Sequence, residues 1–319
     1  MELEFLERAM ELAERGRGAT RTNPIVGAVV VADGEVVGEG WHERKGGPHG
    51  EVNALAAAGE RARGATVYVT LEPCSHHGDT PPCTDALVEA GVARVAAGQR
   101  DPNPRVEGGG LELLENAGIE VELAEGEIAF RCRQQIEEWR TWIATGRPFV
   151  TYKVAITLDG RVTVPGSRWV TGEESRRLVH VLRARSDAVA VGMGTVRWDN
   201  PRLDARDVGA VRQPRRLAFG RGPLPEGSEL ELRSGPLVEE LEQLAADGVQ
   251  SLLLEGGPTL AAAFLEQGLV DKLLVFVAPK VSGEGPGMLA GTAAPVELSR
   301  LESRSIGDDL LIQAYVHEP

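Results

Sequence analysis

Two short stretches decide how this chain folds and what it does: HGEVNAL at residues 49–55 and PCSHHGDTPPC at residues 73–83. The whole chain has three cysteines and six histidines, and two of the cysteines lie in the second stretch. One histidine and two cysteines form a three-ligand zinc shell, which leaves the fourth position of a catalytic zinc open for water. The pattern therefore predicts a zinc site made by His49, Cys74 and Cys83.

Glu51 is the carboxylate nearest in sequence to the predicted ligands. Zinc lowers the pKa of a bound water, and a nearby carboxylate can take its proton and pass it to a leaving amine. We therefore predict that Glu51 is the catalytic proton carrier. Two positions along a regular helix correspond to about 200° of rotation. His49 and Glu51 therefore share a site only if His49 lies at the helix cap, outside the helical spiral.

The H-x-E pair is weak evidence by itself, because such a pair on a helix seldom marks zinc. The two cysteines, each in a proline-containing turn, favour a metal strongly. A closed structural zinc is one alternative, since His76, His77 or Cys132 offers a fourth ligand. A zinc-stabilised interaction protein without enzyme activity is another, and metal removal would then unfold it.

The composition is that of a globular protein, with 42% hydrophobic and 26% charged residues in a chain of 319. A net charge of -14 argues against a nucleic-acid-binding or nucleic-acid-editing protein, because affinity for a phosphate polymer comes from Lys and Arg. A small phosphorylated ligand needs only a few local cations. No apolar run reaches the roughly 20 residues of a membrane span, and the three cysteines without a secretion signal favour reduced thiols in the cytoplasm.

Strand and helix patterns alternate along both halves of the chain. Such alternation predicts mixed or parallel sheets covered on both faces by helices, so the fold class is α/β. Residues 125–146 predict one long helix that ends at Gly146, just before a proline. We therefore expect two domains, residues 1–146 and residues 147–319.

Two local signals predict finer features. Residues 25–40 predict a β-hairpin whose turn is Asp33-Gly34, because this pair favours the left-handed conformations of a two-residue turn. Thr171 and Glu174 have the spacing of a capping box, which predicts a helix start at Thr171.

The motifs NPIVGAVV, HGEVNAL, TLEPCSHHGDTPPC and DPNP follow one another in the first half. Together they resemble the cytidine-deaminase fold, and specifically the deaminase half of the bifunctional riboflavin-biosynthesis deaminase-reductases, the RibD family. The eight residues between the cysteines are typical of that family and depart from the P-C-x-x-C spacing of nucleobase deaminases. The resemblance implies a three-layer α/β/α domain that binds zinc and in which Asn23, His76 and His77 contact the substrate. Gly50 and Asn53 stand where the family usually has alanine and commonly histidine, but neither is a predicted ligand.

The motifs YKVAITLDGR, SRWVTGEESR, GMGTVRWDNPRLDAR and LEGGPTLA follow in the second half. They resemble the reductase half of the same enzymes, whose α/β fold is like dihydrofolate reductase and whose cofactor is NADPH. A self-associating homo-oligomer is also implied. Carried over by position, the residues expected to bind the phosphorylated sugar are Lys153, Ser167, Arg183, Leu203, Arg206 and Glu255, and those expected to bind the cofactor are Ile156, Trp169, Thr195, Asp199 and Gly257.

One region departs from the family. Between Arg206 and Glu255 the family usually has additional sequence, including an acidic residue and a further strand, and this chain is shortened there. A deaminase with a degenerate second domain is therefore the alternative to a bifunctional enzyme. The 2′-phosphate of NADPH needs a cationic partner, for which Arg197 and Arg216 are both candidates. The expected reactions are zinc-dependent deamination of a phosphorylated diaminopyrimidine and NADPH-dependent reduction of its ribosyl group to ribityl.

Overall fold

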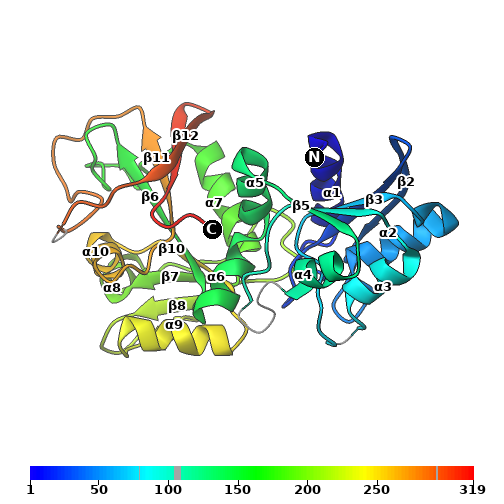
Figure 1. Ribbon diagram of the computed structural model, residues 1–319. Helices are drawn as coiled ribbons and strands as arrows, with labels where there is room; N and C mark the ends of the chain where they lie inside the picture. Colours follow the sequence, from blue (N-terminus) through cyan, green and yellow to red (C-terminus); the bar gives the residue numbers. More distant parts are fainter. Residues whose placement is uncertain (79, 104–108, 292–293) are drawn as a thin grey trace. The chain divides into compact units, whose positions relative to one another are not determined.

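The computed structural model describes residues 1–78, 80–103, 109–291 and 294–319. The chain divides into two compact units, Met1–Thr145 together with Pro319, and Gly146–Glu318. Each unit has its own sheet and its own helices (Figure 1). Among the described residues, every helix is too short or too polar to cross a lipid bilayer.

The first unit begins with a helix and then alternates strands and helices, as the hydrophobic pattern predicts. In chain order its elements are α1 (Leu3–Glu14), β1 (Gly27–Ala32), β2 (Glu35–Trp41), α2 (Gly50–Ala58), the 3-10 turn η1 (Gly59–Ala62), β3 (Thr66–Val69), α3 (Cys83–Ala90), β4 (Arg94–Ala97), α4 (Gly109–Asn116), β5 (Glu120–Leu123), α5 (Gly126–Gln135) and α6 (Glu137–Thr145).

The sheet of the first unit has the strand order β2-β1-β3-β4-β5. β1 is antiparallel to β2 and β3, whereas β3, β4 and β5 are parallel. Helices α1 and α5 pack on one face, and α2, α3 and α4 pack on the other (Figure 1). The α/β/α layers confirm the predicted fold class. The hairpin turn is also confirmed, because Asp33 and Gly34 both have positive φ, at 52° and 78°.

Glycines in β2 bring α2 close to the sheet. A Cβ atom at Gly40 would lie 2.3 Å from the backbone nitrogen of Ala54, and one at Gly38 would lie 2.3 Å from the Ala54 oxygen. Only a residue without a side chain permits this approach. The contact fixes the first turn of α2, where two of the predicted site residues lie.

The second unit is also α/β, with a longer sheet. In chain order its elements are β6 (Phe149–Thr157), α7 (Glu173–Arg185), β7 (Ala188–Gly192), α8 (Met193–Asp199), β8 (Arg215–Phe219), β9 (Glu231–Arg233), α9 (Leu237–Ala246), β10 (Ser251–Leu254), α10 (Pro258–Glu266), β11 (Lys272–Ala278), β12 (Ser299–Ile306) and β13 (Asp309–Tyr315).

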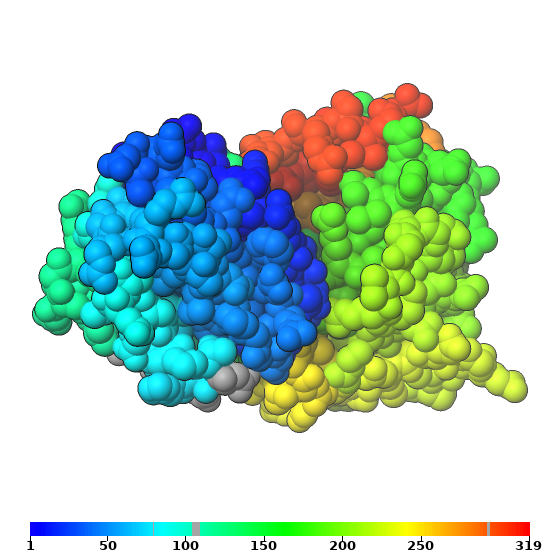
Figure 2. All heavy atoms as spheres, turned by 90° about the vertical axis from the view of Figure 1, so that its right-hand side faces the viewer, coloured from blue at the N-terminus to red at the C-terminus, as the bar shows by residue number. Residues whose placement is uncertain are grey.

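The strand order of the second sheet is β12-β13-β11-β6-β10-β7-β8-β9. The strands from β11 to β9 are parallel, and the C-terminal hairpin β12–β13 adds an antiparallel edge. Helices α9 and α10 cover one face, and α7 and α8 cover the other. β12 is mostly exposed, and the red atoms of this region lie at the surface in Figure 2. This hairpin was not among the strands predicted from the sequence.

Three local predictions were wrong. The long helix over residues 125–146 is two helices, with non-helical Ile136 between them at φ −124°. The break has a packing cause: Ile128 and Cys132 in α5 face the α1 side of the sheet, whereas Ile136 and Trp139 pack in the core of the opposite face. One straight helix cannot reach both cores.

The capping box at Thr171 does not form. Gly172 is the N-cap of α7, and its N–H donates to Asp309 Oδ2 at 2.8 Å. The hydroxyl of Ser175 donates to the same oxygen at 2.6 Å. A carboxylate distant in sequence therefore caps this helix.

The third wrong prediction concerns the shortened region between Arg206 and Glu255. The strand expected to be missing there is present, as the three-residue strand β9.

Candidate active site

The start of α2 places His49 and Glu51 in one site. His49 is the N-cap residue of α2, with an extended backbone at φ −74° and ψ 167°. It therefore lies outside the helical spiral, as the spacing requires. Glu51 lies in the first turn and is only 3% exposed.

The three predicted metal ligands lie together. His49 Nδ1 is 3.2 Å from Cys83 Sγ and 3.5 Å from Cys74 Sγ, and the ligand atoms all lie within 4.8 Å of one another. A tetrahedral zinc with bonds of about 2.0–2.3 Å needs ligand atoms at such separations. One nitrogen and two sulfur donors around this space fit zinc.

A fourth protein ligand is not found among the residues that the structure describes. Cys132 packs with the α1 side of the sheet, in a core separate from that of Cys83's helix. His76 and His77 are exposed and do not join the cluster. The closed structural zinc with His76, His77 or Cys132 is therefore not supported, and among the described residues the cluster offers three ligands and an open fourth position. Asp79, between the cysteines, and Pro104, in the DPNP motif, lie outside the described residues.

The electrostatics of the cluster favour a thiolate beside a proton-carrying carboxylate. Hydrogen bonds from the Cys83 thiol and from His49 lower the pKa of Cys74 well below that of an ordinary thiol. Burial, followed by the neighbouring Cys74, raises the pKa of Glu51 to about 7. One oxygen of Glu51 has no hydrogen-bond partner among the described residues. A carboxyl group with this pKa can take up and release a proton near neutral pH.

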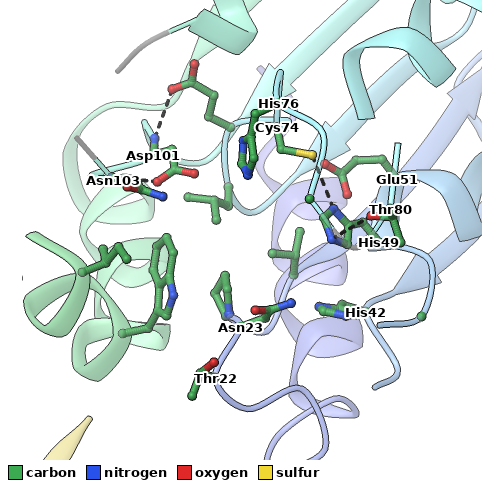
Figure 3. A pocket seen from close by; sticks show the side chains of 18 of the residues that line it. Thr22, Asn23, His42, His49, Glu51, Cys74, His76, Thr80, Asp101 and Asn103 are labelled. Carbon is green, nitrogen blue, oxygen red and sulfur yellow. Dashed lines mark hydrogen bonds between the residues drawn. The ribbon is translucent and has the colours of Figure 1, made fainter. Parts of the chain in front are cut away.

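A cavity of about 370 Å³ opens beside the cluster (Figure 3). Its size suits a small ligand. Asn23 and His76, both predicted to contact the substrate, line it, whereas His77 does not. The polar side chains that line this cavity beyond the metal cluster and Glu51 are Thr22, Asn23, His42, Glu72, His76, Thr80, Asp101 and Asn103, and Trp139, Trp142 and Ile143 of α6 complete its wall.

Two residues that line the cavity, His42 and Asp101, were not predicted from the sequence as site residues. His42 is 2% exposed, and its Nε2 atom has no hydrogen-bond partner among the described residues. Burial raises the pKa of Asp101 to about 6. Asp101 lies in the DPNP motif just beyond β4, so a polar run after a strand end was the available signal. His42 had no comparable signal, since it follows a strand tryptophan.

Glu72 fixes the segment that carries Asp101. One of its carboxylate oxygens accepts the N–H groups of Gly110 and Leu111, both at 3.1 Å, at the start of α4. The other oxygen accepts the Asp101 N–H at 3.0 Å. Because Glu72 is separated from Cys74 by a single residue, it links the ligand loop to the opposite wall of the cavity.

A second cluster of predicted residues lies in the second unit. Arg183 binds the Glu255 carboxylate through two hydrogen bonds, at 2.6 and 3.0 Å, and Lys153 approaches it at 3.4 Å. Burial by itself would raise the pKa of Glu255, but Lys153 and Arg183 outweigh it and lower the pKa to about 2. Glu255 is therefore a fixed negative charge that positions two cations.

The loop after α8 adjoins this cluster. Arg183 Nη1 donates to the Asp204 carbonyl at 3.2 Å, and Arg206 Nη1 donates to the Asp204 carboxylate at 2.6 Å. Leu203 is buried and has a positive φ of 54°. Four predicted sugar-phosphate residues, Arg183, Leu203, Arg206 and Glu255, are thus connected through one loop.

The remaining predicted residues are placed as follows. The Ser167 hydroxyl donates to the Trp169 carbonyl at 2.8 Å, so these two lie together. The Trp169 ring is 47% exposed, with the guanidinium groups of Arg168 and Arg176 about 5 Å from its centre. Ile156 lies near the end of β6, and Asp199 is the exposed last residue of α8.

Glycines line the carboxyl ends of adjacent parallel strands. Gly192 ends β7, Gly220 follows β8, and Gly256 and Gly257 follow Glu255 after β10. A Cβ atom at Gly257 would lie 3.4 Å from Thr195 Oγ1, so these two predicted cofactor residues are neighbours. Ligands of open α/β sheets bind at this edge. Glycines at these strand ends let a ligand approach the backbone closely, which fits a dinucleotide such as NADPH.

Comparisons with known proteins agree with both sites. Residues 1–99 match the cytidine and deoxycytidylate deaminase zinc-binding region, and residues 148–312 match the RibD C-terminal domain. The riboflavin biosynthesis protein RibD of Aquifex aeolicus is 40% identical over 97% of this chain and 96% of its own length. That of Escherichia coli is 39% identical over 97% of both, in an alignment of 360 positions. That alignment is longer than this chain, so the relative carries insertions.

Solved structures give the same result over nearly the whole chain. Acinetobacter baumannii RibD has a TM-score of 0.84 at 36% identity, covering 98% of each chain. A Thermotoga maritima deaminase and reductase has a TM-score of 0.80 at 35% identity, covering 98% of this chain and 97% of the other. A zinc-binding deaminase domain joined to a reductase domain defines a bifunctional deaminase-reductase. The chain belongs to the RibD family of riboflavin biosynthesis proteins.

Proposed function

We propose that the chain catalyses two successive steps on one small phosphorylated pyrimidine. The Thermotoga maritima relative is described as a diaminohydroxyphosphoribosylaminopyrimidine deaminase and 5-amino-6-(5-phosphoribosylamino)uracil reductase, and we assign the same pair of reactions here. The observation that carries the assignment is the three-ligand His-Cys-Cys cluster, which opens on a cavity beside a buried carboxylate.

In the first step the pyrimidine loses its exocyclic amino group to water. His49, Cys74 and Cys83 would hold the zinc ion, which would supply a water activated at neutral pH. Glu51 carries the proton from the attacking water to the departing amine, and its burial, which raises its pKa, favours uptake of that proton. Asn23, Asp101 and the other polar side chains of the cavity orient the ring, and the α6 side chains exclude bulk water.

In the second step the ribosyl group is reduced to ribityl, with NADPH as hydride donor. Arg183 and Arg206 bind the substrate phosphate, because guanidinium groups match its geometry. Glu255 keeps Arg183 and Lys153 in place, so that Lys153 can orient the sugar. Ser167 and Leu203 complete the substrate contacts, and the residues assigned to the cofactor are Ile156, Trp169, Thr195, Asp199 and Gly257.

The proposal assigns residues 1–146 to deamination and residues 147–319 to reduction. The division of the chain into two compact units at residues 145 and 146 supports this boundary. Reduced Cys74 and Cys83 are needed as ligands, which favours the cytoplasm. A net charge of -14 opposes a nucleic-acid substrate. Self-association into a homo-oligomer follows from the family alone and is testable by light scattering.

Mass spectrometry of the reaction products tests both steps at once. The zinc-loaded protein is incubated with the diaminopyrimidine phosphate and NADPH. Deamination replaces an amino group with oxygen and reduction adds two hydrogens, so each step shifts the mass differently. The Glu51→Gln variant should produce neither mass change from this substrate. When it is given the already deaminated compound, it should still reduce that compound as the parent protein does. Deamination without reduction in the parent protein would refute the second assignment. If neither change appeared, the first assignment would be refuted, and failure to reduce supplied deaminated compound would refute the second as well.

A further inference from the structure

The end of β8 presents an arginine with no internal role. Arg221 lies between Gly220 and Gly222, directly after the strand, and its side chain is exposed. No hydrogen bond or ion pair of its guanidinium group occurs within the part of the chain that the structure describes, whereas Arg206, Arg215 and Arg216 each pair with a carboxylate. A cation without a partner at a ligand-binding edge is available for an external anion.

A second arginine contacts the backbone of the same loop. Arg197 lies in α8, and its Nη2 atom donates to the Arg221 carbonyl at 2.6 Å. A Cβ atom at Gly222 would lie 2.8 Å from that Nη2, so the glycine lets the Arg197 side chain lie across the backbone. Within the described residues Arg197 also has no carboxylate partner. The hydrogen bond to the Arg221 carbonyl holds the Arg197 side chain in place and leaves its other N–H donors available for another acceptor.

Arg216 is excluded as a partner in this site. It is the second residue of β8, so three residues of strand, about 10 Å at 3.3 Å per residue, separate it from the carboxyl end. It also binds Glu229 at 2.9 Å and the Arg202 carbonyl at 3.3 Å. The charge of Arg216 is already neutralised by the Glu229 carboxylate.

We propose that Arg197 and Arg221 bind the 2′-phosphate of NADPH and set the preference of the reductase for NADPH over NADH. The proposal rests on the reductase function assigned above. β8 is the neighbour of β7, whose carboxyl end carries Gly192 and Thr195, so the arginine pair continues the glycine-lined edge by one strand. A phosphate dianion there receives two guanidinium groups, which favour phosphate strongly. NADH lacks that group and gains nothing from either arginine.

Calorimetric titration of the full-length protein with NADPH and with NADH tests the pair without any turnover. The parent protein should bind NADPH more tightly. Arg221→Ala and Arg197→Ala should each weaken NADPH binding by about tenfold or more and leave NADH binding unchanged, because each removes one charge-assisted contact. Arg221→Lys should restore part of the loss. Arg216→Ala is the matched control, an arginine of the same strand, and should keep the preference.

The outcomes separate the inference from the function on which it rests. Unchanged NADPH binding in both alanine variants, or equal binding of NADPH and NADH by the parent protein, overturns the arginine pair but leaves the reductase assignment standing. A parent protein that binds neither nucleotide overturns both. Equal weakening for NADPH and NADH in Arg221→Ala also overturns the inference, since that result indicates a general effect on the edge. A steeper salt dependence for NADPH than for NADH supports it.

Discussion

Two buried glutamates show how neighbouring charges decide what a carboxylate does. Burial raises the pKa of Glu51 to about 7, and one of its oxygens has no partner among the described residues. The side chain of Glu255 is also largely shielded, at 9% exposed, yet Lys153 and Arg183 lower its pKa to about 2. The same side chain is therefore suited to carry a proton in one unit and is a permanent anion in the other.

Glu255→Gln is expected to destabilise the second unit in a pH-dependent way. A carboxylate with a depressed pKa stabilises the folded state above its unfolded value of 4.5, and this contribution is lost as the pH falls toward 2. The shift corresponds to about 3 kcal/mol at pH 7. Hydrogen exchange of the β6 and β10 amides should show this loss at pH 7, and the difference from the parent should shrink between pH 4.5 and 2.

Glu266→Gln serves as the control for that comparison. Glu266 is the exposed last residue of α10, and removing its charge should leave exchange in β6 and β10 unchanged at every pH. If Glu255→Gln lowered the free energy of unfolding equally at pH 7 and pH 3, packing rather than charge would explain the loss. The ion-pair account of this site would then be wrong.

At the scale of elements, two helices are held by carboxylates distant in sequence. Asp309 caps α7, and Glu72 binds the first N–H groups of α4. Local patterns predicted the helices themselves, because amphipathic spacing is a property of neighbouring residues. They could not predict these caps, since the partners are brought together only by the sheet. For that reason the capping box at Thr171, a purely local signal, was wrong.

Paired glycines at the start of α4 offer an element-scale prediction. A Cβ atom at Gly110 would lie 2.0 Å from the Pro73 carbonyl oxygen, whereas one at Gly109 would meet only the Ser75 hydroxyl, at 3.1 Å. Gly110→Ala should therefore move the helix start away from the Cys74 segment and cost about 1–3 kcal/mol. Gly109→Ala, the matched control, should change stability by less than about 0.5 kcal/mol.

Zinc affinity is a second property in which the Gly110→Ala and Gly109→Ala variants should differ. If α4 supports the ligand segment, Gly110→Ala should also weaken zinc binding in a competition titration with a chelator, while Gly109→Ala should not. A Gly110→Ala protein with the parental unfolding midpoint and zinc affinity would show that this close approach is not required.

At the scale of the whole molecule, the sequence predicted most of the architecture and part of each site. The zinc ligands were predictable because cysteine is scarce and both copies lie in proline-containing turns. His42 was not, because it reaches the cavity only through the sheet topology, whereas Asp101 had a signal in the polar run after a strand end that was not used. The edge strand β12 of the C-terminal hairpin was missed because its residues are mainly polar or charged and exposed, so that the alternation of a half-buried strand is weak.

The two compact units predict that metal removal separates the two activities. Chelation of zinc should abolish deamination, because His49, Cys74 and Cys83 supply the site, all within the first unit. Reduction of supplied deaminated compound should continue at the parental rate, since Lys153, Arg183 and Glu255 lie in the second. Circular dichroism of the metal-free protein provides the structural control, and restored deamination on zinc addition shows reversibility. Loss of both activities with global unfolding would instead indicate a structural zinc on which the whole chain depends.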